Sequence, residues 1–128
     1  TAAIGLQLAL SVKVEDLIRL AAPREGSAAA ERLALLRAEV AGLRAMTYRA
    51  LLREPANASE GSVVRLPFGE IAQRVHRAAM DMLGPDALAE NAWTHDYLES
   101  YSETIAGGTA EIQRNIIAER ILGLPRVK

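Results

Sequence analysis

The sequence predicts an all-α protein: an up-and-down four-helix-type bundle with an extra short helix. Apolar residues recur at three- and four-residue steps over several long stretches, and proline or glycine separates one stretch from the next. No segment of useful length alternates apolar and polar residues as an amphipathic strand does. With 128 residues, 50% of them hydrophobic, the chain is long enough for one domain with its own core, spanning 1–128.

The first expected helix covers residues 2–22 and is apolar around most of its circumference. We expect it to be buried on more than one side, and therefore to drive self-association. A break over 23–26 separates it from a second helix over 28–53, for which Ser27 is a suitable N-cap. The second helix has a buried apolar face, and the charged residues on its other side are typical of a solvated surface.

Residues 54–67 are rich in turn-forming residues, so we expect a loop there. A third helix over 67–83 follows, because apolar residues return at helical spacing after Pro67 and Gly84-Pro85 ends the pattern. The remaining expected elements are a short helical turn over 86–91 and two helices over 93–102 and 109–122.

The segment before the last expected helix combines a glycine turn with a helix start. Gly107 and Gly108 permit backbone angles that other residues resist, and they allow a ligand to approach the main chain. Thr109 is a suitable N-cap, whose hydroxyl can accept from a backbone N–H of the first turn. The free N–H groups of that turn favour an electron-rich or anionic group. Isoleucines at helical spacing predict that one face of this helix is buried: Ile112, Ile116, Ile117 and Ile121.

Composition argues against several classes of function. A net charge of −1 gives no reason to expect nucleic acid or an anionic membrane surface as a partner. The apolar run over 1–12 is too short to span a bilayer, so we expect no membrane insertion. The absence of cysteine fits a reducing compartment, and we expect a cytoplasmic protein. His76 and His95 lack the convergent ligands of a metal site, so we expect none, and we expect His76 to be a packing residue.

The run from Gly107 to Arg126 resembles the C-terminal signature of the FAD-dependent acyl-CoA dehydrogenases, reading Gly-Gly-Thr-x-Glu-Ile-Gln-Arg-Asn at its start. The resemblance implies that residues 1–128 are the C-terminal helical bundle of a three-domain subunit. It also implies an enzyme of fatty acid metabolism that oxidises an acyl-CoA thioester to the 2,3-enoyl-CoA. In such a protein Gly108 would approach the thioester, while Thr109 and Glu111 would contact the flavin.

The same resemblance implies FAD as the cofactor and an electron-transfer flavoprotein, or a similar acceptor, as the redox partner. It implies a homo-oligomer, dimer or tetramer, or a hetero-oligomer with a related subunit. The isolated bundle is expected neither to hold FAD tightly nor to be active, because the family's flavin site also uses the β-domain.

Three departures from the family pattern weaken the expected site. Gly107 stands where many members have the catalytic glutamate, and we name no catalytic residue. Other members place the base near the start of the bundle's first helix, and Glu15 is about 20 Å too far along that helix. Residues 23–26 replace an Arg-x-x-Phe-Gly segment, and Asp81 replaces the glutamine of a Gln-x-x-Gly-Gly turn. A catalytically silent dehydrogenase-like subunit, or a helical interaction module that lacks the base, therefore stays open as an alternative.

Overall fold

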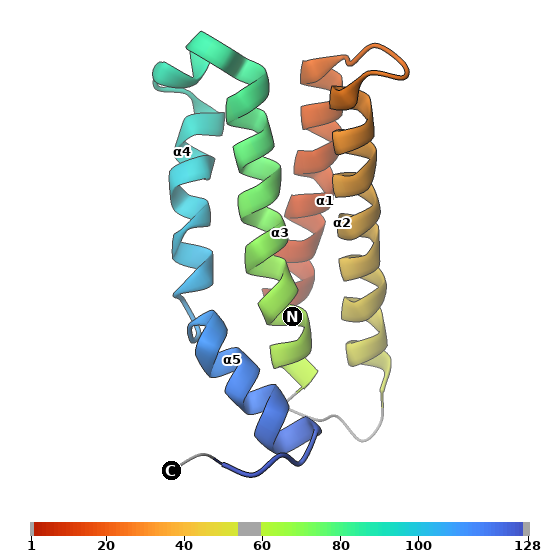
Figure 1. The fold of residues 1–128 in the computed structure, drawn as a ribbon, viewed down its shortest axis with the longest axis vertical. Helices are drawn as coiled ribbons and strands as arrows, with labels where there is room; N and C mark the ends of the chain where they lie inside the picture. Colours follow the sequence, from red (N-terminus) through yellow and green to blue (C-terminus); the bar gives the residue numbers. More distant parts are fainter. Residues whose placement is uncertain (1, 54–59, 127–128) are drawn as a thin grey trace.

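The computed structural model describes residues 2–53 and 60–126, and within these ranges it contains helices and no strand. Three long helices, α1 (Ala2–Ala21), α2 (Ala28–Leu52) and α3 (Glu60–Leu83), run up, down and up side by side (Figure 1). The shorter elements follow in order: η1 (Gly84–Leu88), α4 (Ala92–Ser100), η2 (Ser102–Thr104), α5 (Ala110–Ile116) and a π-helical turn, η3 (Ile117–Ile121). The prediction of an all-α bundle is confirmed, and none of the described helices meets the length and hydropathy of a membrane span.

The core lies between α1, α2 and α3, where the predicted apolar faces meet. Leu17, Leu33 and Val75, one from each helix, are almost completely buried. Burial of a side chain of this size stabilises the fold by about 1.5–3 kcal/mol, which is why the apolar spacing decides the packing. Trp93 of α4 packs against the edge of this core, and Lys13 Nζ lies 4.3 Å from the centroid of its ring.

The expected loop over 54–67 is wrong for its second half, because α3 already begins at Glu60 and Pro67 lies inside the helix. Residues 54–59 lie outside the described part of the chain. Val64 and Phe68 are buried on the same face as the later core positions of α3. A proline in a helix removes a backbone hydrogen bond, and the burial of this apolar face outweighs that cost.

Within the single chain, only part of the apolar circumference of α1 is covered, as expected for a helix that packs against another domain or another subunit as well. Its inner face packs against α2 and α3, but Leu8, Val12 and Leu20 are exposed. The self-association that we expected from this helix stays a prediction.

Candidate functional site

The glycine turn between η2 and α5 has the backbone conformation that its sequence predicts. Gly107 and Gly108 have φ angles of +75° and +108°, in the region that side chains disfavour. The Gly108 N–H donates to the Ile105 carbonyl at 3.2 Å and closes the turn. The φ of Gly108 favours glycine, and a Cβ added there would lie 2.8 Å from Nε2 of Gln113, so it would also displace that amide.

Arg65, on α3, holds the turn from the side of the bundle. Its Nη2 donates to the Glu103 carbonyl at 3.0 Å and also to the Ala106 carbonyl. Its Nη1 lies 3.4 Å from the Glu103 carboxylate. Because charged hydrogen bonds that are partly shielded from water are among the stronger ones, Arg65 connects both ends of the turn to a rigid helix. Sequence reasoning missed Arg65, which lies in the stretch that we expected to be a loop.

Gln113 holds the turn from the other side. Its side chain is buried, and its Nε2 donates to the Gly107 carbonyl at 2.8 Å. Arg114, the next residue of α5, reaches Glu70 of α3 with 3.0 Å between the charged atoms. The last helix is therefore positioned on α3 by polar contacts.

The predicted buried isoleucine face of this helix is wrong in the single chain. Ile112 and Ile121 are exposed, and Ile116 and Ile117 are only half-buried. The π-helical turn η3, closed by Leu122 N–H to the Ile117 carbonyl, departs from regular helical spacing at Ile121, whereas Ile112 lies before this turn on the exposed side of α5.

Thr109 and Glu111 lie at the start of α5, and both side chains are exposed. Thr109 is the N-cap by its extended backbone, and its carbonyl accepts from the Gln113 N–H at 3.0 Å. Its hydroxyl makes no capping bond, contrary to our expectation. The pKa of the Glu111 carboxyl is lowered. The larger cause is a hydrogen bond from the backbone N–H of Glu111 itself, and the second is a hydrogen bond from the Thr109 hydroxyl. A hydroxyl and a carboxylate thus stand together at the positive end of the helix dipole.

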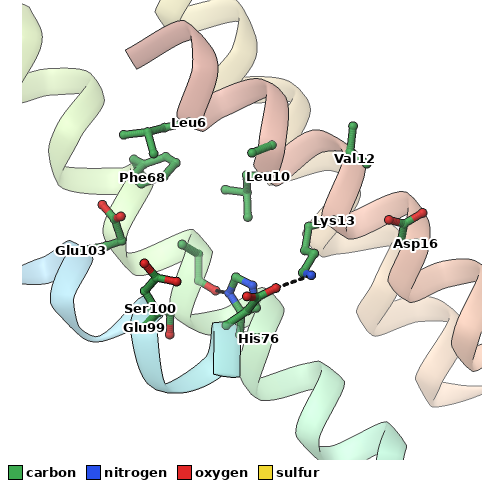
Figure 2. A pocket seen from close by; sticks show the side chains of 13 residues that line it. Leu6, Leu10, Val12, Lys13, Asp16, Phe68, His76, Glu99, Ser100 and Glu103 are labelled. Atoms are coloured by element: carbon green, nitrogen blue, oxygen red, sulfur yellow. Dashed lines mark hydrogen bonds and ion pairs between the residues drawn. The ribbon is translucent and has the colours of Figure 1, made fainter. Parts of the chain in front are cut away.

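The hollow at the turn itself, lined by Arg65, Gly108 and Gln113 among others, has only about 20 Å³, whereas a larger cavity of about 530 Å³ lies between α1, α3 and α4. Figure 2 shows Leu6, Leu10 and Phe68 on its apolar side. The other side carries Glu99 and Glu103, of which Glu103 is paired with Arg65, and the lysine that lines it, Lys13, is paired with Asp96. The cavity fits an apolar group far better than a phosphate, because carboxylates repel anions.

The two histidines have different surroundings. His76 is buried, with Nδ1 2.8 Å from the Ala72 carbonyl, and burial lowers its pKa despite this contact, so it has the packing role that we expected. His95 is exposed, and its ring lies with Asp96 and Glu99 in a group whose ligand atoms are within 4.8 Å of one another. Burial raises the pKa of Asp96, but its hydrogen bond with Lys13 outweighs this and lowers it.

The structure also places the residues at which the sequence departs from the family pattern. Glu15 and Asp16 of α1 are engaged with Arg37 and Arg19, each at 2.6 Å, so neither is a free base. Asp81, which replaces the glutamine of the family's turn, forms an exposed ion pair with Arg32 at 2.7 Å.

The family model and the curated proteins that match this chain are all acyl-CoA dehydrogenases. The family model described as the acyl-CoA dehydrogenase C-terminal domain matches residues 14–122. Acyl-CoA dehydrogenase IpdE1 of Mycobacterium tuberculosis is 37% identical over 96% of this chain, and the match covers 34% of that protein. IpdE1 of Mycolicibacterium smegmatis is 41% identical over 66% of the chain and 23% of its own length. The chain thus spans about a third or less of these relatives.

A solved structure with the same fold comes from the ChsE4–ChsE5 complex of Mycobacterium tuberculosis. The TM-score is 0.76 over 96% of this chain and 36% of that one, at 20% sequence identity. At this identity the likeness establishes the helical fold.

Proposed function

This chain belongs to the acyl-CoA dehydrogenase family as its C-terminal domain, and we propose that it forms part of the flavin and thioester pocket of an FAD-dependent enzyme. The enzyme would oxidise an acyl-CoA to the 2,3-enoyl-CoA and pass electrons to an electron-transfer flavoprotein or a similar acceptor. The observation that carries the proposal is the glycine turn, which Arg65 and Gln113 hold in one shape and which leads into an exposed helix start.

The residues present fit a flavin at the start of α5. Thr109 offers an exposed hydroxyl, and the first-turn N–H groups point out of the helix end, where the dipole favours electron-rich atoms. We propose that Thr109 and Glu111 contact FAD there. When bound, FAD accepts the hydride that leaves the substrate, and the protein supplies binding and orientation.

We propose that the Gly108 backbone lies against the thioester. Gly108 is half-buried at the edge of the turn, and Gln113 Nε2 occupies the side on which a Cβ would stand, so a substrate would approach the main chain from the other side. We assign no catalytic base within the described residues, because position 107 is glycine and the carboxylates of α1 are engaged in ion pairs. The apolar side of the neighbouring cavity supports an apolar acyl group as the part of the substrate closest to the bundle.

We propose that the parent protein is a cytoplasmic oligomer, with either identical or related subunits. The FAD contact is argued from the start of α5 and the oligomer from the relatives, so the two parts of the proposal can fail separately.

The experiment compares three variants of the longest form of the protein that binds flavin: Thr109→Ala, Thr109→Ser and Thr109→Asn. Flavin affinity is measured from the visible absorption spectrum, and stability from thermal unfolding. We expect Ala to weaken flavin binding by about 0.5–1.5 kcal/mol, the contribution of one neutral hydrogen bond, and Ser to restore it. If Ala and Asn both bind flavin as tightly as the natural protein, the proposed contact is wrong.

A further inference from the structure

The cavity between α1, α3 and α4 has an apolar part and a part that can form hydrogen bonds. Leu6 and Phe68 lie together in the apolar part, whereas His76 lies away from them, near Lys13 (Figure 2). The volume of about 530 Å³ falls among those of pockets that bind small molecules. The cavity can therefore hold an organic group, and the chemistry of His76 decides which kind.

His76 uses one ring nitrogen in the fold and leaves the other without a partner. Its Nδ1 lies 2.8 Å from the Ala72 carbonyl, and a carbonyl oxygen only accepts, so Nδ1 carries the proton. Within the described ranges Nε2 has no hydrogen-bond partner. Burial lowers the pKa of His76, so the ring is neutral near pH 7. Nε2 of this neutral ring is an acceptor.

The free acceptor belongs to a nearly buried side chain. His76 is 9% exposed and lines the cavity. Among the described residues, the fully enclosed polar side-chain atom without a partner is on Glu39, so Nε2 of His76 is open to the cavity. An unpaired acceptor in such surroundings costs free energy, and a ligand that donates to it removes that cost.

The groups around His76 favour a neutral donor as this ligand. Asp96 and Glu99 also line the cavity, and the ammonium of Lys13 is paired with Asp96. A ligand carboxylate would be repelled by these acidic groups. A ketone or ether oxygen has no proton to give to Nε2. A hydroxyl has one, and it adds no charge to the site.

The position of His76 along α3 gives its distance from the glycine turn. Gly69 lies against Thr104, the last residue of η2 before that turn, since a Cβ added at Gly69 would be 3.2 Å from Thr104 Cγ2. His76 is seven positions further along α3, which is about 10 Å at about 1.5 Å per residue. An extended acyl group of about eight carbon atoms covers this distance, because its single bonds of about 1.5 Å advance somewhat less along the chain axis.

We propose that the acyl group of the substrate carries a hydroxyl about 10 Å from the thioester, and that His76 determines specificity by accepting a hydrogen bond from it. The inference rests on the proposed function, because it takes the thioester to lie against Gly108. His76 is too far along α3 to act on the carbon atoms next to the thioester, so its role is recognition.

The cavity can be tested without flavin, on the whole chain, with octanol and with methyl heptyl ether, which has the same number of heavy atoms. We expect octanol to bind about fivefold more tightly by calorimetry, the effect of one hydrogen bond, and to shift the ¹⁵N resonance of His76 Nε2. His76→Phe should bind the two probes equally, whereas His95→Phe, which alters the exposed histidine, should keep the difference. Far-ultraviolet circular dichroism checks that both variants fold. Equal affinities in the natural chain, or an unchanged Nε2 resonance, overturn the inference.

A second measurement separates this inference from the proposed reaction. The longest form of the protein that binds flavin is compared with octanoyl-CoA and ω-hydroxyoctanoyl-CoA, and affinity and oxidation are measured separately. We expect the hydroxylated ester to bind about fivefold more tightly, and His76→Phe to remove the preference. If both esters bind but neither is oxidised, the proposed reaction fails, while the ratio of affinities still decides the role of His76. Equal affinities would mean that another part of the protein fills the cavity, and the inference would be wrong.

Discussion

The start of α2 and the start of α5 are both capped by a hydroxyl residue, but only one hydroxyl acts as a cap. The Ser27 side chain accepts from the Ala30 N–H at 3.2 Å. Thr109 has the same extended backbone, yet its hydroxyl donates to Glu111 instead. The start of α2 is thus fixed by its local sequence, whereas the turn that leads into α5 is held by the side chains of Arg65 and Gln113.

The difference shows how a helix start can be kept accessible. At α2 the capping hydroxyl uses the N–H groups that would otherwise bind a ligand. At α5 Arg65 and Gln113 hold the turn by donating to carbonyls and leave those N–H groups to other acceptors, and of these the Glu111 N–H donates to its own carboxylate. The proposed flavin contact requires this second arrangement.

The largest expected effect tests whether the α5 start depends on α3. Arg65→Met keeps the length of the side chain but removes its hydrogen bonds to Glu103 and Ala106. We expect a loss of about 2 kcal/mol in unfolding free energy and faster amide exchange in the turn. Arg19→Met, which breaks an exposed pair with Asp16, is the control and should cost less than about 0.5 kcal/mol. Unchanged exchange at Gly107 and Gly108 would show that Arg65 does not hold the turn.

A smaller effect is expected from the opposite side of the turn. Gln113→Ala removes the donor to the Gly107 carbonyl and a buried side chain, so we expect a loss of about 1.5 kcal/mol by chemical denaturation. Asn115→Ala, at an exposed position nearby, should change stability by less than about 0.5 kcal/mol. Equal effects of the two substitutions would contradict the role of Gln113.

The two caps can be compared directly. Ser27→Ala should cost about 1 kcal/mol, the usual cost of a lost N-cap. Thr109→Ala should cost less than about 0.5 kcal/mol, because no backbone N–H loses its partner. Thermal unfolding of both variants measures this, and a larger effect at Thr109 would mean that its hydroxyl caps the helix in solution.

The smallest expected effect is a titration. The pKa of the Glu111 carboxyl should lie below its ordinary value, because its backbone N–H and the Thr109 hydroxyl donate to the charged form. Because this pKa is lower in the folded than in the unfolded chain, Glu111 stabilises the fold at pH values above its unfolded pKa. This contribution is lost as the pH falls through the pKa of the folded state. Thr109→Ala should raise this pKa partway, as followed by NMR. No change would show that the hydroxyl does not donate to Glu111.

Periodicity predicted the long helices well, because their apolar faces are buried continuously. The expected range 28–53 is within one residue of Ala28–Leu52. The prediction from periodicity failed at Pro67, because the burial of Phe68 keeps the chain helical despite the proline. For the same reason Arg65 was assigned to a loop and not to α3. The glycine turn could be predicted from its residues, but its two supports could not. One is a contact across 41 positions of sequence, and the other is a side-chain hydrogen bond from Gln113 back to the Gly107 carbonyl, which apolar spacing does not reveal.

Trp93 gives the bundle an optical signal of its own. It is the single tryptophan of the chain, and it lies between Lys13 of α1 and His76 of α3, 4.3 and 6.4 Å from its ring centroid. Indole emission depends on nearby charge and on access of water. Its fluorescence therefore reports separation of α4 from α1 and α3. Opening of this side of the molecule can be timed without any attached label.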